Sequence, residues 1–199
     1  MRFLLATLNR GKLRELQAVL SDLGIELVSL DLFPDLPEAV EDGASFEENA
    51  RKKALHYWEL TSLPSIADDS GLVVDALGGR PGVYSARLAP DDPSRIRAVL
   101  DGLRAAGPGA PRSARFVCSL CAVLDGTRRI EVEGTVEGRI AEEPRGERGF
   151  GYDPIFLYEP YGRTFGEVSA DEKNAVSHRA VALRRLKSRL RSELDLSVA

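Results

Sequence analysis

Hydrophobic positions form short runs and helical spacings in the first part of the chain. The apolar run from Arg2 to Thr7 predicts a strand, and leucines at helical spacing from Leu13 to Leu23 predict a helix that ends at a glycine. A second strand is expected from Ile25 to Leu30. A helix from Ser45 to about Leu60 is predicted because a glutamate three residues after the serine completes a capping-box pattern. Strands and helices therefore alternate here.

The rest of the chain adds a strand, two helices and a long hairpin. Pro64 to Asp69 is typical of a strand that ends in an acidic turn, and Asp92 followed by proline predicts a helix to about Ala106. Arg115 to Leu124 and Arg129 to Glu142 are joined by Asp-Gly, which favours a β-hairpin. The last helix is expected after Ser177. This order predicts an α/β fold with a mixed sheet, as a single domain over residues 1–199.

Composition excludes several classes of protein. Hydrophobic residues make up 43% of the 199 residues and charged residues 29%, which is too much apolar content for a disordered chain. The 27 Lys and Arg against 31 Asp and Glu give a net charge of −4, which argues against a general polynucleotide binder. The N-terminal apolar run is too short for a signal peptide or a membrane span. A cytoplasmic protein that can bind a small polyanion is expected.

The two cysteines, Cys118 and Cys121, have the CxxC spacing of metal and redox sites. They lie in an apolar run that predicts a buried strand, where side chains three residues apart point to opposite faces. A second pair of cysteines or histidines at zinc-site spacing is also missing from the sequence. Two reduced cysteines in the core are therefore the preferred interpretation.

The turn between the first strand and the first helix offers donors for an anion. Thr7, Asn9 and Lys12 supply hydroxyl, amide and ammonium groups where the free N–H groups of a helix begin. Such a set suits a polyphosphate. The alternative is a solvated turn in which Asn9 only caps the helix.

Adjacent carboxylates at Asp68 and Asp69 are candidates for Mg²⁺ binding or for orienting an attacking water. Only one of them can face a given cleft from an extended backbone, and the other is expected to be structural. A plain acidic turn is the alternative. Glu41 in a preceding loop and Glu48 in the following helix are further carboxylates, each of which can equally be solvated or serve in capping.

Three further groups could contact a ligand. Lys53 shares a helix face with Asn49 and can enter a cleft, although an exposed helix lysine is the alternative. The loop from Phe150 to Asp153 carries two aromatics suited to stacking on a planar base, or equally to core packing. His178 and Arg179 open the last helix, where cationic charge is unfavourable unless an acceptor lies close.

Taken together, these segments resemble the inosine triphosphate pyrophosphatase family over almost the whole chain. Members of that family hydrolyse deaminated purine nucleoside triphosphates (ITP, dITP, XTP) to the monophosphate and pyrophosphate. Each block alone is weak evidence, but five in the same order are highly specific. The matching blocks are Thr7-x-Asn9-x-x-Lys12, the stretch from Glu41 to Ala54, Ala67 to Leu72 with Leu77 to Arg87, Gly149 to Pro154, and Glu172 to Asn174 with Ser177 to Arg179.

The resemblance implies a two-lobed α/β domain around a long mixed sheet with the active site in a central cleft. It implies that Asp69 is the general base and a Mg²⁺ ligand and that Glu41 is a second acidic residue of the metal site. The triphosphate would be bound by Thr7, Asn9, Lys12 and Lys53, with Ser70 as a further substrate contact. The base pocket would be formed by Phe150, Gly151, Tyr152, Asp153, Lys173, His178 and Arg179.

The same resemblance implies Mg²⁺ as cofactor, a purine nucleoside triphosphate as substrate and a homodimer. Arg179 is a donor that could favour the 6-oxo group of a deaminated purine over the 6-amino group of adenine. Two alternatives stay open at this point. One is a nucleotide sensor without turnover, and the other is a septum-inhibitor-like pyrophosphatase with different base specificity.

Overall fold

A hydrogen-bonded sheet of seven strands runs through the part of the chain described by the computed structural model, residues 1–195, in the order β2-β1-β3-β4-β5-β6-β7. The first three strands pair in parallel, whereas β5, β6 and β7 pair antiparallel, so the sheet is mixed as predicted. The strands are β1 Arg2–Leu5, β2 Glu26–Ser29, β3 Ser65–Val74, β4 Ser113–Val123, β5 Arg129–Ile140, β6 Phe156–Tyr158 and β7 Arg163–Thr164. The helices are α1 Arg10–Leu20, α2 Phe46–Thr61, α3 Asp92–Ala105, α4 Ala170–Val176 and α5 His178–Glu193.

The chain divides into two compact units, each built from segments that are distant in sequence. Unit 1 consists of Met1–Asp69, Cys118–Gly134 and the chain from His178 onward. Unit 2 consists of Ser70–Val117 and Thr135–Ser177. Three of the strands, β3, β4 and β5, therefore contribute residues to both units.

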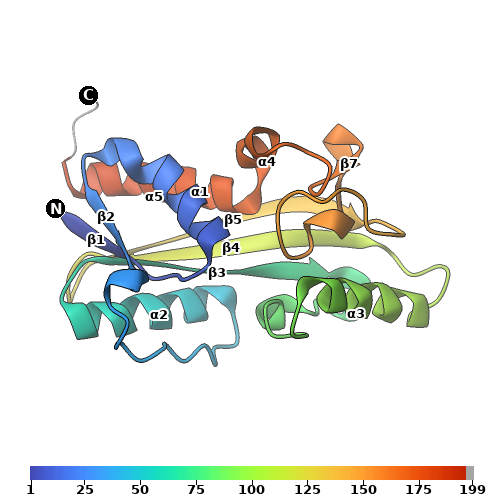
Figure 1. Cartoon of the computed structure of the whole chain (residues 1–199), viewed down its shortest axis with the longest axis horizontal. Coiled ribbons are helices and arrows are strands. Elements are labelled where there is room, and N and C mark those ends of the chain that lie inside the picture. The colour runs from blue at the N-terminus through green and yellow to red at the C-terminus, as the bar shows by residue number, and fades with distance from the viewer. Residues whose placement is uncertain (196–199) are drawn as a thin grey trace. The chain divides into compact units, whose positions relative to one another are not determined.

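Unit 1 has two hydrophobic clusters, one on each face of its strands. Phe3 and Leu5 of β1 pack with leucines of α1 and α5, whereas Leu4 and Ala6 pack with alanines and Tyr57 of α2. This alternation follows from the two-residue period of a strand. Figure 1 shows α1 and α5 on one side of these strands and α2 on the other. Every side chain of β3 that belongs to this unit therefore faces either α1 and α5, or α2.

Unit 2 has one core, which α3 and an aromatic cluster build together. Leu100 and Leu103 of α3 pack with Phe116, Phe156 and Phe165. The rings of Phe116 and Phe156 lie 4.5 Å apart between centroids, a distance typical of favourable aromatic pairs. The loops and short strands after β5 are thereby anchored to a rigid core.

Most of the predicted elements are confirmed, but the acidic turn after residue 67 is wrong. β3 continues without interruption from Ser65 to Val74, so Asp68 and Asp69 lie in the middle of a strand and not at its end. The strand can continue because both carboxylates are buried and have polar partners, Asp68 on one face of the strand and Asp69 on the other. This polar pair, which predicted a turn, therefore belongs to a continuous strand whose two carboxylates have partners on both faces.

Two helix starts also differ from the prediction. Asp91 rather than Asp92 caps α3, with its carboxylate accepting from the Ser94 N–H. At α2, Ser45 accepts from Glu48 N as expected, but the Glu48 carboxylate accepts from Ala44 N and not from Ser45 N. At α4, by contrast, Ser169 and Glu172 form a complete capping box.

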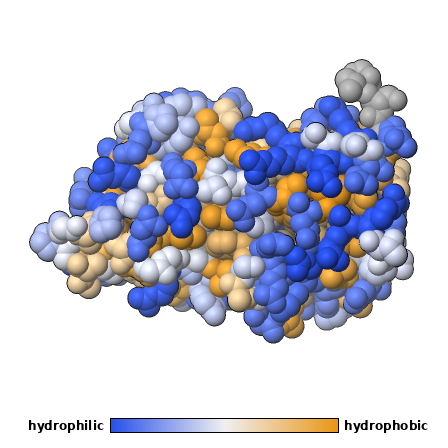
Figure 2. Space-filling view, turned by 180° about the vertical axis from the view of Figure 1, so that it is seen from behind, coloured by the Kyte–Doolittle hydropathy of each residue, from blue (hydrophilic) through white to orange (hydrophobic). Residues whose placement is uncertain are grey.

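The surface has the mixture of side chains usual for a globular chain. Polar and charged groups dominate the face drawn in Figure 2, with apolar groups visible between them. None of the helices in residues 1–195 is long and apolar enough to cross a membrane.

The cysteines are buried on opposite faces of β4, as predicted. Cys118 belongs to the cluster with α1 and α5, and Cys121 to the cluster with α2. Burial raises the pKa of each thiol to about 12, so neither forms a reactive thiolate near neutral pH.

We expect a thiol reagent at pH 8 to leave the native protein unmodified and to label both cysteines in denaturant. Rapid labelling of the native protein would contradict this burial.

Candidate functional site

The two central carboxylates of β3 point to opposite faces of unit 1. Asp68 forms an ion pair with Lys12 of α1 and lies within hydrogen-bonding distance of Arg179 of α5. Asp69 accepts a hydrogen bond from Asn49 of α2. The alternation expected from an extended backbone is confirmed, although both carboxylates are integrated into polar networks.

Asp68 is the centre of a buried cluster of charges. The Lys12 ammonium lies 2.9 Å from Asp68 Oδ2, and two nitrogens of Arg179 lie 3.4 Å from the same oxygen. Burial opposes ionisation of Asp68, but Lys12, Arg179 and Lys53 outweigh it and hold the pKa of the carboxyl below its usual value. Asp68 is therefore ionised and stabilises three cations.

Arg179 also binds Glu15, a residue that the sequence did not single out. The Glu15 carboxylate lies 2.7 Å from an Arg179 nitrogen, one helical turn beyond Lys12 on α1. Arg179 is 2% exposed. Ion pairs with Asp68 and Glu15 stabilise this cation at the start of α5. The spacing of Lys12 and Glu15 on one helix face was the signal that could have identified Glu15.

Lys53 interacts electrostatically with both Glu41 and Asp69. The Lys53 ammonium forms a close ion pair with Glu41 and donates to the Asp68 carbonyl oxygen at 3.1 Å. Burial raises the pKa of Asp69, and the Asn49 hydrogen bond and the charges of Lys12 and Lys53 offset part of that effect. The structure thus brings together the loop acid, the helix lysine and the strand acid that the sequence predicted.

The predicted phosphate turn is ordered by its own side chains. Asn9 caps α1, and its side-chain oxygen accepts from the N–H groups of Gly11 and Lys12 at 2.9 and 3.1 Å. The hydroxyl of Thr7 accepts from Asn9 N. Asn9 therefore caps α1, and this cap fixes the turn from which Lys12 projects.

Unit 2 contains a second polar group, centred on Asp153. This buried carboxylate accepts from Phe150 N at 2.8 Å and pairs with the Lys173 ammonium at 2.5 Å. The same ammonium lies 4.7 Å from the centroid of the Phe150 ring, a cation–π distance. A Cβ on Gly149 would lie 2.0 Å from the Asp153 carboxylate, so only glycine fits there. Phe150, Asp153 and Lys173 form one compact group.

The other predicted residues of the base pocket have different surroundings. Tyr152 is 4% exposed, its hydroxyl donates to the Ser85 carbonyl, and burial raises its pKa to about 12, so it packs in the core. Gly151 N donates to an Asp92 carboxylate oxygen at 2.7 Å. Ser70 belongs to β3 in unit 2, and His178 is buried at the first position of α5 in unit 1. Tyr152 is thus a core aromatic, the alternative that the sequence left open.

The donor set of unit 1 fits a hard cation better than a soft one. Glu41 and Asp69 offer carboxylate oxygens. Mg²⁺ is usually bound by one or two protein carboxylates together with water molecules and substrate phosphates. Among residues 1–195, no group of three or more His, Cys, Asp or Glu side chains is arranged to hold a metal ion. A fully protein-ligated zinc-type centre is therefore not built into the described chain.

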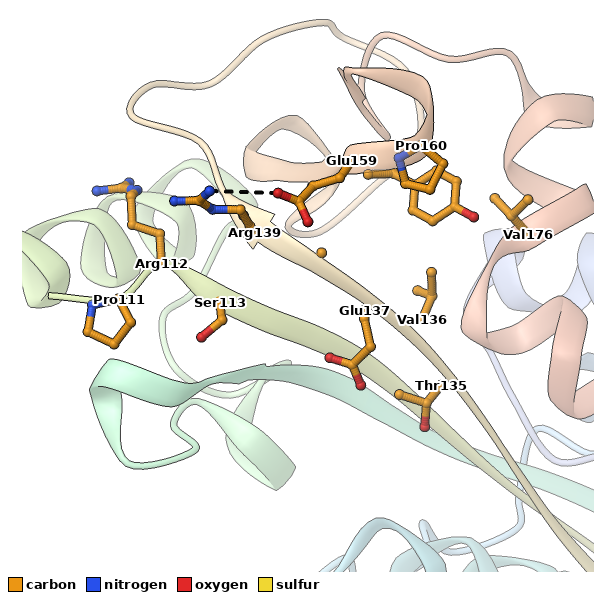
Figure 3. A pocket seen from close by; sticks show the side chains of 12 residues that line it. Pro111, Arg112, Ser113, Thr135, Val136, Glu137, Arg139, Glu159, Pro160 and Val176 are labelled. Atoms are coloured by element: carbon orange, nitrogen blue, oxygen red, sulfur yellow. Dashed lines mark ion pairs between the residues drawn. The ribbon is translucent and has the colours of Figure 1, made fainter.

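A hollow of about 880 Å³ in unit 2 lies apart from these groups. It is lined by Ser113, Thr135, Glu137 and Tyr158 among others, and none of the predicted site residues lines it. Figure 3 shows Arg139 and Glu159 at its rim, joined by an ion pair. Arg139 pairs with Glu159, and Arg112 donates to the carbonyl oxygens of Ile140 and Ala141, so both arginines that line this hollow are engaged within the protein.

Comparison with known proteins gives a consistent result. Residues 3–189 match the family model described as Ham1 family. The chain is 50% identical over 195 residues to a protein of Symbiobacterium thermophilum named dITP/XTP pyrophosphatase, covering 98% of this chain and 97% of that protein. A Geobacter sulfurreducens protein of the same name is 47% identical, with 95% and 96% covered. The solved structure of a HAM1 protein from Coxiella burnetii superposes with a TM-score of 0.90 at 42% identity, covering 96% and 99% of the two chains.

The charge cluster around Asp68 yields a stability prediction. Asp68→Asn removes the anion that the half-buried Lys12 and the buried Arg179 share, so we expect the free energy of unfolding to fall by about 3 kcal/mol, the loss typical of a broken buried ion pair. Urea unfolding measures this change. Asp42→Asn is the matched control, because its pair with Lys52 is exposed to water and is expected to contribute little to stability. Equal losses in the two variants would contradict the central role of Asp68.

Proposed function

The chain belongs to the Ham1 family, and from that premise we propose that it hydrolyses deaminated purine nucleoside triphosphates (ITP, dITP and XTP) to the monophosphate and pyrophosphate. The observation that carries the proposal is the pair of lysines in unit 1, Lys12 and Lys53, held beside the carboxylates of Asp68, Asp69 and Glu41. Paired cations beside acids are what cleavage of a phosphoanhydride requires.

The reaction splits one phosphoanhydride bond. Water attacks the α-phosphorus, the bond from that phosphorus to the bridging oxygen breaks, and pyrophosphate leaves with the bond's electron pair. Asp69 accepts a hydrogen bond from the attacking water and takes its proton, a role favoured by burial that raises the pKa of the carboxyl. Lys12 and Lys53 bind phosphate oxygens and stabilise the charge that moves toward the leaving group.

Glu41 and Asp69 would hold Mg²⁺ in this proposal. When bound, the ion neutralises phosphate oxygens of the substrate. Lys53 already pairs with Glu41 and donates to the Asp68 carbonyl, which places its charge where the triphosphate would be recruited. Two carboxylates suit Mg²⁺, which takes one or two protein oxygens together with water and substrate phosphates, and this fit supports Mg²⁺ as the cofactor.

Recognition of the base is assigned to the compact group in unit 2. Phe150 is half-buried, so part of its ring is accessible for stacking on a purine. Lys173 supplies a cation beside that ring, and a donor of this kind suits the 6-oxo acceptor of a deaminated purine. His178 and Arg179 remain part of the proposed base pocket, with the Arg179 guanidinium already engaged by Asp68 and Glu15.

Two further properties belong to the same proposal. The resemblance to the pyrophosphatase family supports a homodimer, which light scattering on the purified protein tests directly. A cytoplasmic location is supported by the proposed substrates, because damaged nucleotides arise in the pool from which nucleic acids are made.

Release of pyrophosphate from a panel of purine and pyrimidine triphosphates, with and without Mg²⁺, tests the activity itself.

Replacing Asp69, the proposed general base, should lower the rate of hydrolysis. We expect Asp69→Asn to lower kcat by about 10² or more, because positioned acid–base groups contribute ~10²–10⁴-fold and the metal site loses an anion. Pyrophosphate release by the folded variant measures the effect. Turnover close to that of the wild type in the presence of Mg²⁺ would show that another group activates the water.

Removing one phosphate-binding cation should act on the triphosphate alone. Lys12→Ala is expected to weaken triphosphate binding by about 1.5–3 kcal/mol, the usual contribution of a hydrogen bond to a charged group, and to leave nucleoside binding nearly unchanged. Isothermal calorimetry with dITP and deoxyinosine compares the two. An equal loss for both ligands would mean that the α1 turn has rearranged instead.

A further inference from the structure

Asn49 connects the two acids of the proposed metal site through one side-chain amide. We propose that Asn49 is a positioning residue for hydrolysis: it fixes the orientation of the Asp69 carboxylate and holds the loop that carries Glu41 against the same site. This inference rests on the proposed function, because it assigns a part in that reaction to a residue that touches neither metal nor substrate.

The amide of Asn49 is fully buried at the start of α2 and makes one contact in each direction. Its Nδ2 donates to Asp69 Oδ2 at 2.9 Å. Its Oδ1 accepts from Gly43 N at 2.7 Å. An amide has a fixed donor end and a fixed acceptor end, and only this orientation satisfies both partners. Asn49 is thus a rigid link between β3 and the loop before α2.

The loop side of this link is closely packed. A Cβ on Gly43 would lie 2.7 Å from Asn49 Oδ1 and 3.0 Å from the side chain of Glu48, so a side chain at position 43 displaces the amide. Glu41 lies two residues before Gly43 and pairs with Lys53 of α2. The hydrogen bond from Gly43 N therefore sets how close Glu41 comes to the other charged groups.

The strand side of the link determines how Asp69 is presented. With Oδ2 held by Asn49, the carboxylate cannot rotate without breaking a buried hydrogen bond, which is costly in a water-poor environment. A carboxylate that binds metal and orients water must keep one rotamer through the reaction. Groups that orient metal ligands in this way typically change metal affinity or activity 10- to 100-fold when removed.

Two substitutions at Asn49 separate its two contacts. Asn49→Asp keeps an acceptor for Gly43 N but replaces the donor to Asp69 with an oxygen, and Asn49→Ala removes both contacts. For the folded variants we expect kcat for dITP to fall about 10- to 100-fold with KM little changed, and Mn²⁺ binding to the nucleotide-free protein, followed by electron paramagnetic resonance, to weaken.

Gly43→Ala tests the same link from the loop side. If it acts through the Asn49 amide, the double variant with Asn49→Ala will be no worse than Asn49→Ala alone, a non-additivity that marks a shared interaction. Gly109→Ala is the matched control, because no atom lies within 4 Å of its added Cβ and its backbone needs no glycine. That control should leave kcat and Mn²⁺ binding at wild-type values.

The outcomes distinguish the inference from the proposed function. Wild-type kcat and Mn²⁺ affinity in folded Asn49→Asp, or fully additive losses in the double variant, overturn the role of Asn49. If Asn49→Ala does not fold, Asn49→Asp and Gly43→Ala still decide the question. A wild-type protein that releases no pyrophosphate from any triphosphate overturns the proposed function, and weakened Mn²⁺ binding in the variants would then still support the positioning role.

Discussion

The buried Asp68 carboxylate is held ionised by the cations around it, Lys12, Arg179 and Lys53, which lower its pKa. A single buried charge of this kind would be strongly unfavourable, and the penalty is offset only when partners and hydrogen bonds are complete. Asp68 of β3 is therefore the anion that binds the cations of both α1 and α5. This arrangement gathers cationic side chains at the proposed triphosphate site in a chain whose net charge is −4.

The continuation of β3 through its acids explains how two adjacent carboxylates can have different roles. Because side chains alternate along a strand, Asp68 faces the cations of α1 and α5 while Asp69 faces α2. The pKa of Asp68 is lowered by those cations, whereas burial raises that of Asp69. One neighbour is held as a permanent anion, and the other keeps the higher proton affinity that a base requires.

Periodicity and capping signals predicted the fold class, the helices and the β4–β5 hairpin, because these depend on local sequence. The course of β3 could not be predicted in this way, since polar residues inside a strand are tolerated only through tertiary partners such as Asn49 and Lys12. Motif blocks identified the acids and lysines of unit 1. The same blocks omit Glu15, whose spacing from Lys12 on α1 was the only local signal for it, and they do not predict the burial of Tyr152, which depends on a contact with the distant Ser85.

The contacts that hold Lys12, Lys53, Asp68 and Asp69 all lie within unit 1, whereas Phe150, Asp153 and Lys173 are held within unit 2. Arg179, which is also proposed for the base pocket, lies in unit 1 and shares Asp68 with Lys12. We therefore expect substitutions around Asp153 to act mainly on the proposed recognition of the base, whereas substitutions at Arg179 would also disturb the charges proposed to act on the phosphates, because residues with a shared partner are coupled. A division of this kind lets one phosphate-cleaving framework serve different bases by changing only the second set of residues.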